Sequence, residues 1–272
     1  MALRSLQSAT SRIARHVTRW WRNAQPSGWD DLQQELDRWH ARDHNLVFWW
    51  RDDDAQTASP ALDQLLELAG RFQMPLALAV IPAGADAPLE RRLARESRVR
   101  VFQHGWDHKN HASPAEPAEL SATRDAAQVR AELAEGRRRL SSLCGGRFLP
   151  VLVPPFNRLS RRLDPAIEAT GFRYISSHGD FGGLPLPSRN THLDVIDWQT
   201  NRVAEPAVIV RTAIVALKLR RYGLVRPGLP LGLVTHHLAH DGPVWSLIEE
   251  VLTRFTRHPA IRAPAIEEIF TV

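Results

Sequence analysis

Short apolar runs alternate with segments of helical character along most of this chain. The strand-length runs are Leu46–Trp50, Leu76–Ile81, Val99–Gln103, Phe148–Val153, Phe172–Ser176, Leu193–Ile196 and Leu231–Val234. The segments between them carry helix signals, such as Ser59-Pro60 ahead of a leucine-rich stretch. Strands that alternate with helices form parallel sheets. Seven such strands predict an α/β fold, a distorted (β/α)7-type barrel, with an open doubly wound sheet as the alternative.

The segments outside the barrel strands also carry predictions. A chain of 272 residues is long enough for one domain with a large core. We expect residues 1–44 to form an N-terminal helical extension and residues 45–272 to form the barrel domain. The Gly- and Pro-rich stretch 178–190 predicts a long surface loop.

Residues suited to metal binding and acid–base chemistry follow the ends of several predicted strands. They are Asp53, Asp54, His104, His108, Pro155, Phe156, Asp197, Trp198 and His236. In parallel α/β folds the carboxyl ends of the strands share one face, and ligands bind there. We therefore expect these residues to meet at one site, although they are far apart in the chain.

The stretch Gln103–His108 is the centre of this predicted site. His104 and His108 are four residues apart, so both imidazoles can reach one ion. The chain has 12 histidines, which makes this spacing weak by itself, and the aspartates after the first strand strengthen it. One carboxylate and two imidazoles suit a zinc ion that keeps a position open for water.

The order of these motifs resembles that of the polysaccharide deacetylase, or NodB-homology, family. Asp53-Asp54 matches the aspartate pair of its first motif, and His104 with His108 matches the His-x-x-x-His of its second. Partial matches to its third, fourth and fifth motifs are Val153-Pro154-Pro155-Phe156, Asp197-Trp198 and Val234-Thr235-His236. The resemblance covers about residues 47–241. It implies a distorted β/α barrel and a metal-dependent carbohydrate esterase activity.

The resemblance also implies roles for individual residues. Asp54, His104 and His108 would bind a divalent metal, for which we expect Zn²⁺ and keep Co²⁺, Ni²⁺ and Fe²⁺ as alternatives. Asp53 would be the catalytic base, and His236 would protonate the leaving amine. The residues expected to contact the substrate or its oxyanion are Phe156, through its backbone N–H, and Pro155, Asp197, Trp198 and His237.

Two departures from the family pattern change what the motifs predict. The arginine that orients the base in the third motif is Val153 here, and we hypothesise that Arg51 takes its place from the first strand. The Ser or Thr that follows the first histidine of the second motif is Gly105 here.

Two assignments stay open between neighbouring residues. The run of three aspartates allows Asp52-Asp53 as the motif pair, although Asp53-Asp54 leaves a small residue in the next position. His237 competes with His236 for the acid role. Neighbours on a strand face opposite sides, and the sequence does not say which of the two faces the site.

Charge and cysteine content limit the classes of partner. The chain has a net charge of +5, but no basic stripe with interleaved aromatic residues, and we expect no nucleic-acid partner. Residues 1–24 carry arginines and no acidic residue, which predicts peripheral contact with an anionic membrane surface. The sequence shows no secretory signal, and it contains one cysteine, Cys144. Both features favour a cytoplasmic location, with peripheral attachment to the inner face of the membrane as the alternative.

These features lead to one functional hypothesis and two alternatives. The leading hypothesis is hydrolysis of the N-acetyl group of an acetamido sugar, a non-peptide carbon–nitrogen bond, in a glycan or glycan precursor. The first alternative is a metal-dependent hydrolase of another amide or of an O-acyl ester. The second is a catalytically degenerate barrel that binds a glycan.

Overall fold

The computed structural model describes residues 28–42, 44–180 and 183–271. Residues 1–24, with their predicted membrane contact, lie outside the described residues. The helices are α2 (Trp29–His40), α3 (Pro60–Arg71), α4 (Ala87–Leu93), α5 (Ala126–Cys144), α6 (Asp164–Glu168), α7 (Pro206–Arg221), α8 (Gly242–Thr256) and α9 (Ile266–Ile269). The strands are β1 (Leu46–Ala55), β2 (Leu76–Val80), β3 (Val99–His104), β4 (Phe148–Val153), β5 (Tyr174–Ile175), β6 (Leu193–Asp194), β7 (Ile196–Asp197), β8 (Arg202–Val203), β9 (Leu231–Thr235) and β10 (Ile261–Arg262).

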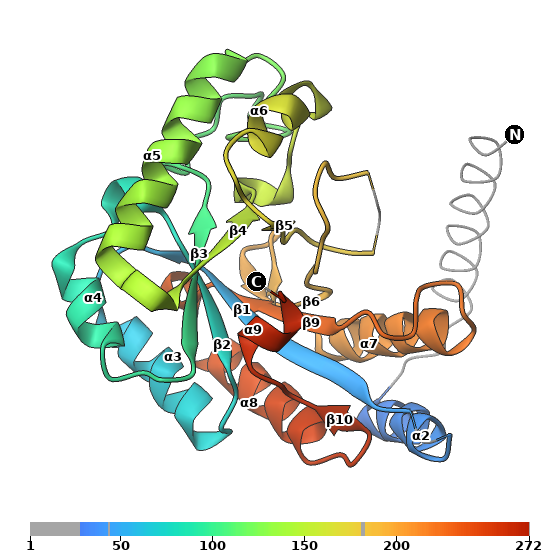
Figure 1. Ribbon diagram of the computed structural model, residues 1–272. Coiled ribbons are helices and arrows are strands. Elements are labelled where there is room, and N and C mark those ends of the chain that lie inside the picture. Colours follow the sequence, from blue (N-terminus) through green and yellow to red (C-terminus); the bar gives the residue numbers. More distant parts are fainter. Residues whose placement is uncertain (1–27, 43, 181–182, 272) are drawn as a thin grey trace, which may run out of the picture.

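A curled parallel sheet with β1 near its middle organises the fold, and helices cover its outer face (Figure 1). The strand order is β5-β4-β3-β2-β1-β9-β6, and β10 pairs with the first residues of β1. β7 and β8 form a separate antiparallel pair. The predicted distorted (β/α)7-type barrel is therefore confirmed.

Residues 187–192 close the barrel between β5 and β6. The Ile175 N–H of β5 donates to the Pro187 carbonyl at 3.0 Å, the Arg189 N–H donates to the Ile175 carbonyl at 3.2 Å, and the His192 N–H donates to the Gly232 carbonyl on β9 at 2.7 Å. The prediction of a surface loop is therefore wrong for the second half of that stretch. Its backbone groups pair with the flanking strands and take the place of a regular barrel strand.

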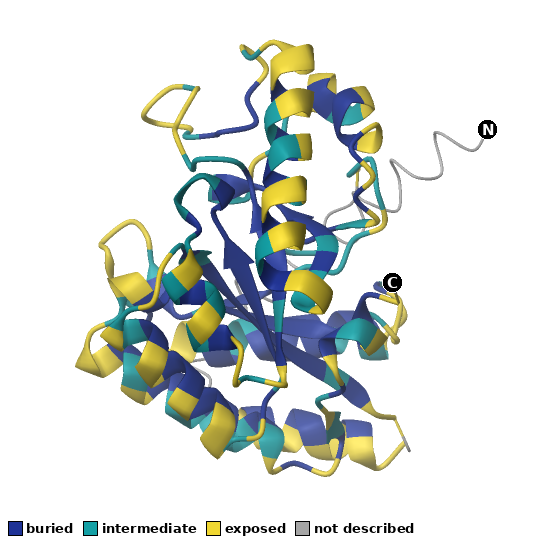
Figure 2. Ribbon diagram, turned by 60° about the vertical axis from the view of Figure 1, so that its left-hand side comes forward, coloured by how far each residue is buried: buried dark blue, intermediate teal, exposed yellow. Residues whose placement is uncertain are grey.

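The two faces of the sheet bury different apolar side chains, and the sheet itself is almost wholly buried (Figure 2). Phe48 on β1 stacks on Phe255 of α8, with ring centroids 4.4 Å apart, so it faces the outer helices. Trp49 contacts Phe270 at 5.2 Å and belongs to the cluster inside the barrel. Because side chains alternate along a strand, Arg51 and Asp53 continue this inner row.

Helix α2 is the described part of the predicted N-terminal extension, and it packs against α7. Leu32 and Leu36 of α2 are buried in the main core. Glu35 accepts two hydrogen bonds from Arg221 of α7, at 2.6 and 3.0 Å. The predicted division at residue 44 stays a prediction.

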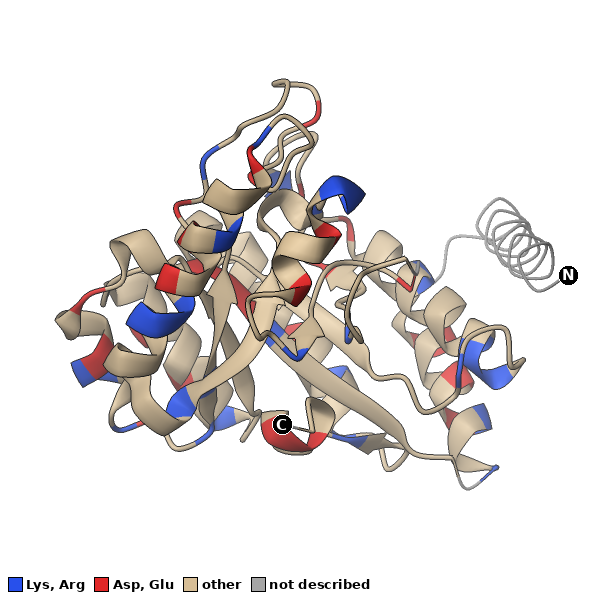
Figure 3. Ribbon diagram, turned by 45° about the horizontal axis from the view of Figure 1, so that its top comes forward, with Lys and Arg blue, Asp and Glu red and all other residues tan. Residues whose placement is uncertain are grey.

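The outer surface mixes charges of both signs. Basic and acidic residues are interspersed over the outer elements in the view of Figure 3. No helix within residues 28–42, 44–180 and 183–271 is long and apolar enough to cross a membrane.

Candidate active site

β1 runs through the three aspartates instead of ending before them. It extends to Ala55, so the expectation that these acids follow the strand end is corrected. Its pairing with β2 shifts between Asp52 and Ala55, and Asp54 has a φ of 72°. Such a bulge adds one residue to a strand and breaks the alternation of its side chains. Asp53 and Asp54, although consecutive, can therefore line the same cleft.

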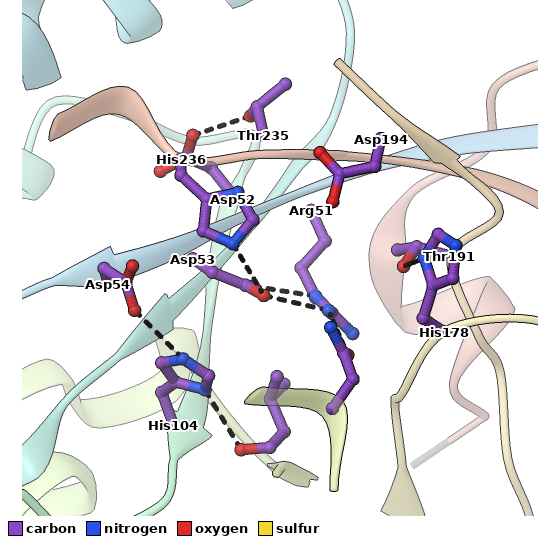
Figure 4. A network of polar contacts seen from close by, with 12 residues as sticks. Arg51, Asp52, Asp53, Asp54, His104, His178, Thr191, Asp194, Thr235 and His236 are labelled. Carbon is purple, nitrogen blue, oxygen red and sulfur yellow. Dashed lines mark hydrogen bonds and ion pairs between the residues drawn. The ribbon is translucent and has the colours of Figure 1, made fainter. Parts of the chain in front are cut away.

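Asp54, His104 and His108 form a group that could hold a metal ion. Their donor atoms all lie within 4.8 Å of one another. The Oδ1 atom of Asp54 is 3.1 Å from His104 Nε2 and 3.2 Å from His108 Nε2 (Figure 4 shows the contact with His104). This oxygen is buried and accepts no hydrogen bond from the residues that the structure describes.

The orientation of His104 fits a metal ligand. Its Nδ1 lies 3.1 Å from the Val153 carbonyl, which can only accept, so Nδ1 carries the hydrogen. The lone pair of Nε2 then faces the Asp54 carboxylate, and a cation between the two would relieve their repulsion. The donor set is thus an anionic oxygen and two imidazole nitrogens, which suits a zinc-type ion.

Glu119 supports the turn between the two histidines, and the sequence analysis did not predict it. Its carboxylate accepts hydrogen bonds from the backbone N–H groups of Trp106 at 2.6 Å and His108 at 2.7 Å. Burial raises the pKa of Glu119 to about 7. Gly105 has a φ of 54°, and a Cβ there would lie 2.5 Å from Glu119 Oε2. Glu119 lies in an irregular loop, so it belongs to no residue spacing in the sequence that could have predicted its role.

Asp53 lies between an arginine and an imidazole on the inner face of the sheet (Figure 4). Arg51 donates from Nε to Oδ1 at 2.7 Å and from Nη2 to Oδ2 at 2.9 Å. The guanidinium is fully buried, and its Nη1 also donates to the Ser176 carbonyl at 2.8 Å. His236 Nε2 lies 3.8 Å from Asp53 Oδ2. The hypothesised contact between Arg51 and the base position is therefore present.

Asp52 and His237 pair away from the cleft. Their Oδ1 and Nδ1 atoms are 2.5 Å apart, and Asp52 Oδ2 accepts a hydrogen bond from the Thr235 hydroxyl at 2.6 Å. Both side chains are buried, and neither lines the cleft. His236, the first residue after β9, therefore lines the cleft, and its neighbour His237 does not. His237, a predicted substrate contact, is not at the site, and Asp53-Asp54 is the pair that is.

The cleft around these residues has a volume of about 420 Å³. Its lining residues are Asp53, Asp54, His104, His108, Pro117, Phe156, Asn157, Arg158, Trp198 and His236. Trp198 is half exposed, and its ring meets the His236 ring edge-on at 4.7 Å. The ring of Phe156 lies 4.5 Å from that of His108. The cleft therefore combines the acid–base groups with an accessible aromatic surface.

Two predicted contacts, Pro155 and Asp197, do not line the cleft. Pro155 is buried, close to Gly105. Asp197 accepts a hydrogen bond from the Gln199 N–H in the turn between β7 and β8. The aspartate near His236 is instead the half-buried Asp194, which accepts a hydrogen bond from Trp198 Nε1 at 2.8 Å. Asp194 falls inside a predicted strand, where its apolar neighbours hid it.

Comparisons with known proteins address the fold. No family model matches this sequence, and no curated protein does. A solved structure assigned as a polysaccharide deacetylase, from Mycobacterium smegmatis, matches with a TM-score of 0.60 and 17% identity, over 83% of this chain and 88% of that one. A family 4 carbohydrate esterase from Streptomyces lividans, in complex with acetate, matches with a TM-score of 0.54 and 15% identity, over 82% and 94%. A family 4 acetyl xylan esterase from Clostridium thermocellum, in complex with a cobalt ion, matches with a TM-score of 0.51 and 13% identity, over 83% and 90%.

The fold is therefore that of the family 4 carbohydrate esterases. The predicted resemblance to the polysaccharide deacetylases is confirmed at the level of the fold, and the low identities make this chain a divergent form of that fold.

Proposed function

We propose that this protein is a metal-dependent deacetylase that hydrolyses the N-acetyl group of an acetamido sugar in a glycan or glycan precursor. One observation carries the proposal: two groups of side chains lie next to each other in a single cleft. The first is the ligand group of Asp54, His104 and His108. The second is the pair of Asp53 and His236, 3.8 Å apart, a carboxylate and an imidazole beside that group.

The residues present fit a divalent metal, and we expect zinc, with cobalt, nickel and iron as alternatives. Held by Asp54, His104 and His108, the ion would supply Lewis acidity, which polarises an acyl oxygen and lowers the pKa of water. Asp53 would accept the proton that the attacking water loses. Arg51 would hold that carboxylate in a fixed orientation through its two-pronged hydrogen bond.

Other residues in and around the cleft would carry out the remaining steps. His236 would give a proton to the leaving nitrogen as the carbon–nitrogen bond breaks, so that acetate and a free amine result. The Phe156 backbone N–H would donate to the oxyanion, a contribution of about 3–4 kcal/mol for a well-aimed donor. Asp194, in place of the predicted Asp197, would hold the Trp198 indole beside His236 through its hydrogen bond from Nε1. Trp198 would pack on the sugar ring.

The test combines metal analysis with acetate release on the wild type and His104→Ala. We expect one metal ion per chain in the wild type, its loss in the variant, and acetate release from N-acetylglucosamine oligomers by the wild type alone. His111→Ala, which changes a nearby histidine outside the ligand group, serves as the control and should keep the metal. Two results would contradict the proposal. One is the absence of metal even after reconstitution. The other is release of acetate from O-acetylated sugars only.

A further inference from the structure

An exposed cation stands in the wall of the candidate cleft. Arg158 lines the cleft together with the ligand group, and it is the single Lys or Arg among the described lining residues. Its side chain is exposed, and its Nη1 donates a long hydrogen bond of 3.4 Å to the Pro117 carbonyl. No ion pair joins it to a carboxylate in the described part of the chain. The guanidinium is therefore available to a ligand.

The backbone explains why Arg158 lies at the cleft. Phe156 and Asn157 follow β4 with φ values of 59° and 53°, two consecutive left-handed residues that turn the chain sharply. The turn is closed by hydrogen bonds from the Asn157 and Arg158 N–H groups to the carbonyls of Pro154 and Pro155, at 3.0 and 3.3 Å. Three consecutive residues, 156–158, consequently line one cavity. Arg158 is thus only two residues from Phe156, whose ring lies on His108.

The charged residues near Arg158 form no ion pair with it in the described part of the chain. Asp53 is held by Arg51, and Asp54 belongs to the ligand group. Arg158 also lines an adjoining groove of about 430 Å³, where Glu116 is the acidic residue among the described lining residues. Arg158 therefore stands at the boundary between the cleft and this groove. An anionic group on a ligand would meet it there, next to the acyl site.

We propose that Arg158 selects an acetamido sugar that bears an anionic group, a phosphate or a carboxylate, near its acetamido group. This inference rests on the proposed function and names its substrate class. A guanidinium binds either anion through two parallel hydrogen bonds, which an ammonium cannot do as well. A neutral glycan would leave this cation of the cleft without a partner.

The test compares three sugars that share the acetamido group. They are the methyl glycoside of N-acetylglucosamine, N-acetylglucosamine 1-phosphate, and the methyl glycoside of N-acetylmuramic acid, whose carboxylate is attached through the oxygen on the carbon next to the acetamido carbon. The wild type should deacetylate one or both anionic sugars with kcat/KM about tenfold above that of the neutral glycoside, because a charge-assisted pair contributes roughly that factor. The sugar with the higher value identifies phosphate or carboxylate as the preferred anion.

Two arginine variants decide whether Arg158 is the cause. Arg158→Gln should abolish the preference through KM, and Arg158→Lys should retain part of it. Arg162→Gln removes the same charge from an exposed position nearby and outside the cleft, and it should retain the whole preference. Equal kcat/KM values for all three sugars in the wild type would overturn the inference. So would the same loss of preference in Arg162→Gln.

A binding measurement separates this inference from the proposed function. If the metal-loaded wild type releases acetate from none of the sugars, the proposed function has failed. Calorimetric titration of that same protein then decides the inference. Tighter binding of an anionic sugar than of the neutral glycoside, lost in Arg158→Gln but not in Arg162→Gln, supports it. Equal binding of all three sugars overturns it.

Discussion

Three consecutive aspartates on β1 have three different environments. Asp52 faces outward and pairs with His237, Asp53 faces inward and pairs with Arg51, and Asp54 joins the ligand group through the bulge. Their chemistry is identical, so the direction in which the backbone points each one sets its environment. The sequence could narrow the motif to two registers, but it could not choose between them. The choice depends on the left-handed backbone conformation of Asp54, which no feature of the neighbouring sequence indicates.

The burial of Arg51 makes a prediction at this scale. Arg51→Ala should lower kcat by roughly 100-fold or more, because Asp53, the proposed base, loses the group that orients it. Metal content should stay at one ion per chain, since Arg51 does not contact the ligand group. Steady-state kinetics and elemental analysis of the same preparation check both statements.

The controls for Arg51 follow from its geometry. Arg51→Lys keeps the charge but not the two-pronged bond, so it should recover only part of kcat. Removing one partner of a buried ion pair costs about 3–5 kcal/mol, and assays should run well below the melting temperature of each variant. Loss of metal together with activity would refute an orienting role for Arg51.

At the scale of elements, tight turns after the strands build the site. The turn after β3 depends on Gly105, and the turn after β4 depends on the left-handed Phe156 and Asn157. The sequence predicted the two histidines but not Glu119. This residue lies in a loop 11 residues after His108, and its carboxylate accepts a hydrogen bond from the His108 N–H in the turn after β3. A contact across an irregular loop leaves no periodicity in the sequence, so a pattern search has nothing to detect.

Gly105→Ala tests the turn after β3. The new Cβ would meet Glu119 Oε2 and Pro155 at 2.5 Å, in a backbone conformation that suits glycine. We expect a loss of roughly 1–3 kcal/mol in the free energy of unfolding, together with weaker metal binding. Gly145→Ala is the matched control, because Gly145 has the same φ of 54° and nothing lies within 4 Å of its Cβ position. Urea unfolding and metal titration of both variants provide the comparison. Equal stability of the two variants would show that Glu119 and Pro155 can move aside.

At the scale of the whole molecule, alternation of strands and helices was enough to predict the barrel. The apolar runs gave the regular strands, because a strand buried on both faces reads as a continuous hydrophobic segment. The closing stretch 187–192 escaped prediction, since it contains Pro, Ser and Asn and is held by hydrogen bonds of its backbone and polar side chains. Prediction therefore succeeded where apolar side chains determine the structure and failed where hydrogen bonds do.

Acid should destabilise the molecule through His240. Burial lowers the pKa of His240 to about 4, below its ordinary value of 6.5, and its Nε2 accepts a hydrogen bond from the His236 N–H. The unfolded chain therefore binds more protons between these two pH values. The contribution to stability is complete above pH 6.5 and is lost as the pH falls toward 4. A shift of this size corresponds to at most about 3 kcal/mol, and less for a partly exposed ring.

Urea unfolding at pH 7.5 and pH 4.5 checks this dependence on His240. The difference in unfolding free energy between the two pH values should be smaller in His240→Gln than in the wild type. Release of any bound metal by acid affects both proteins and cancels in the comparison. An unchanged difference would mean that other groups account for the sensitivity to acid.

The central position of β1 has a consequence for the synthesis of the chain. One edge of β1 pairs with β2, which follows within about 20 residues, but the other edge pairs with β9, which begins at Leu231. During translation, most of the polypeptide must leave the ribosome before that second edge is covered. The nascent chain therefore carries an open strand edge next to Trp49 and Trp50, a feature that invites non-native association. Rapid folding after release, or protection by a chaperone until then, becomes a requirement of this topology.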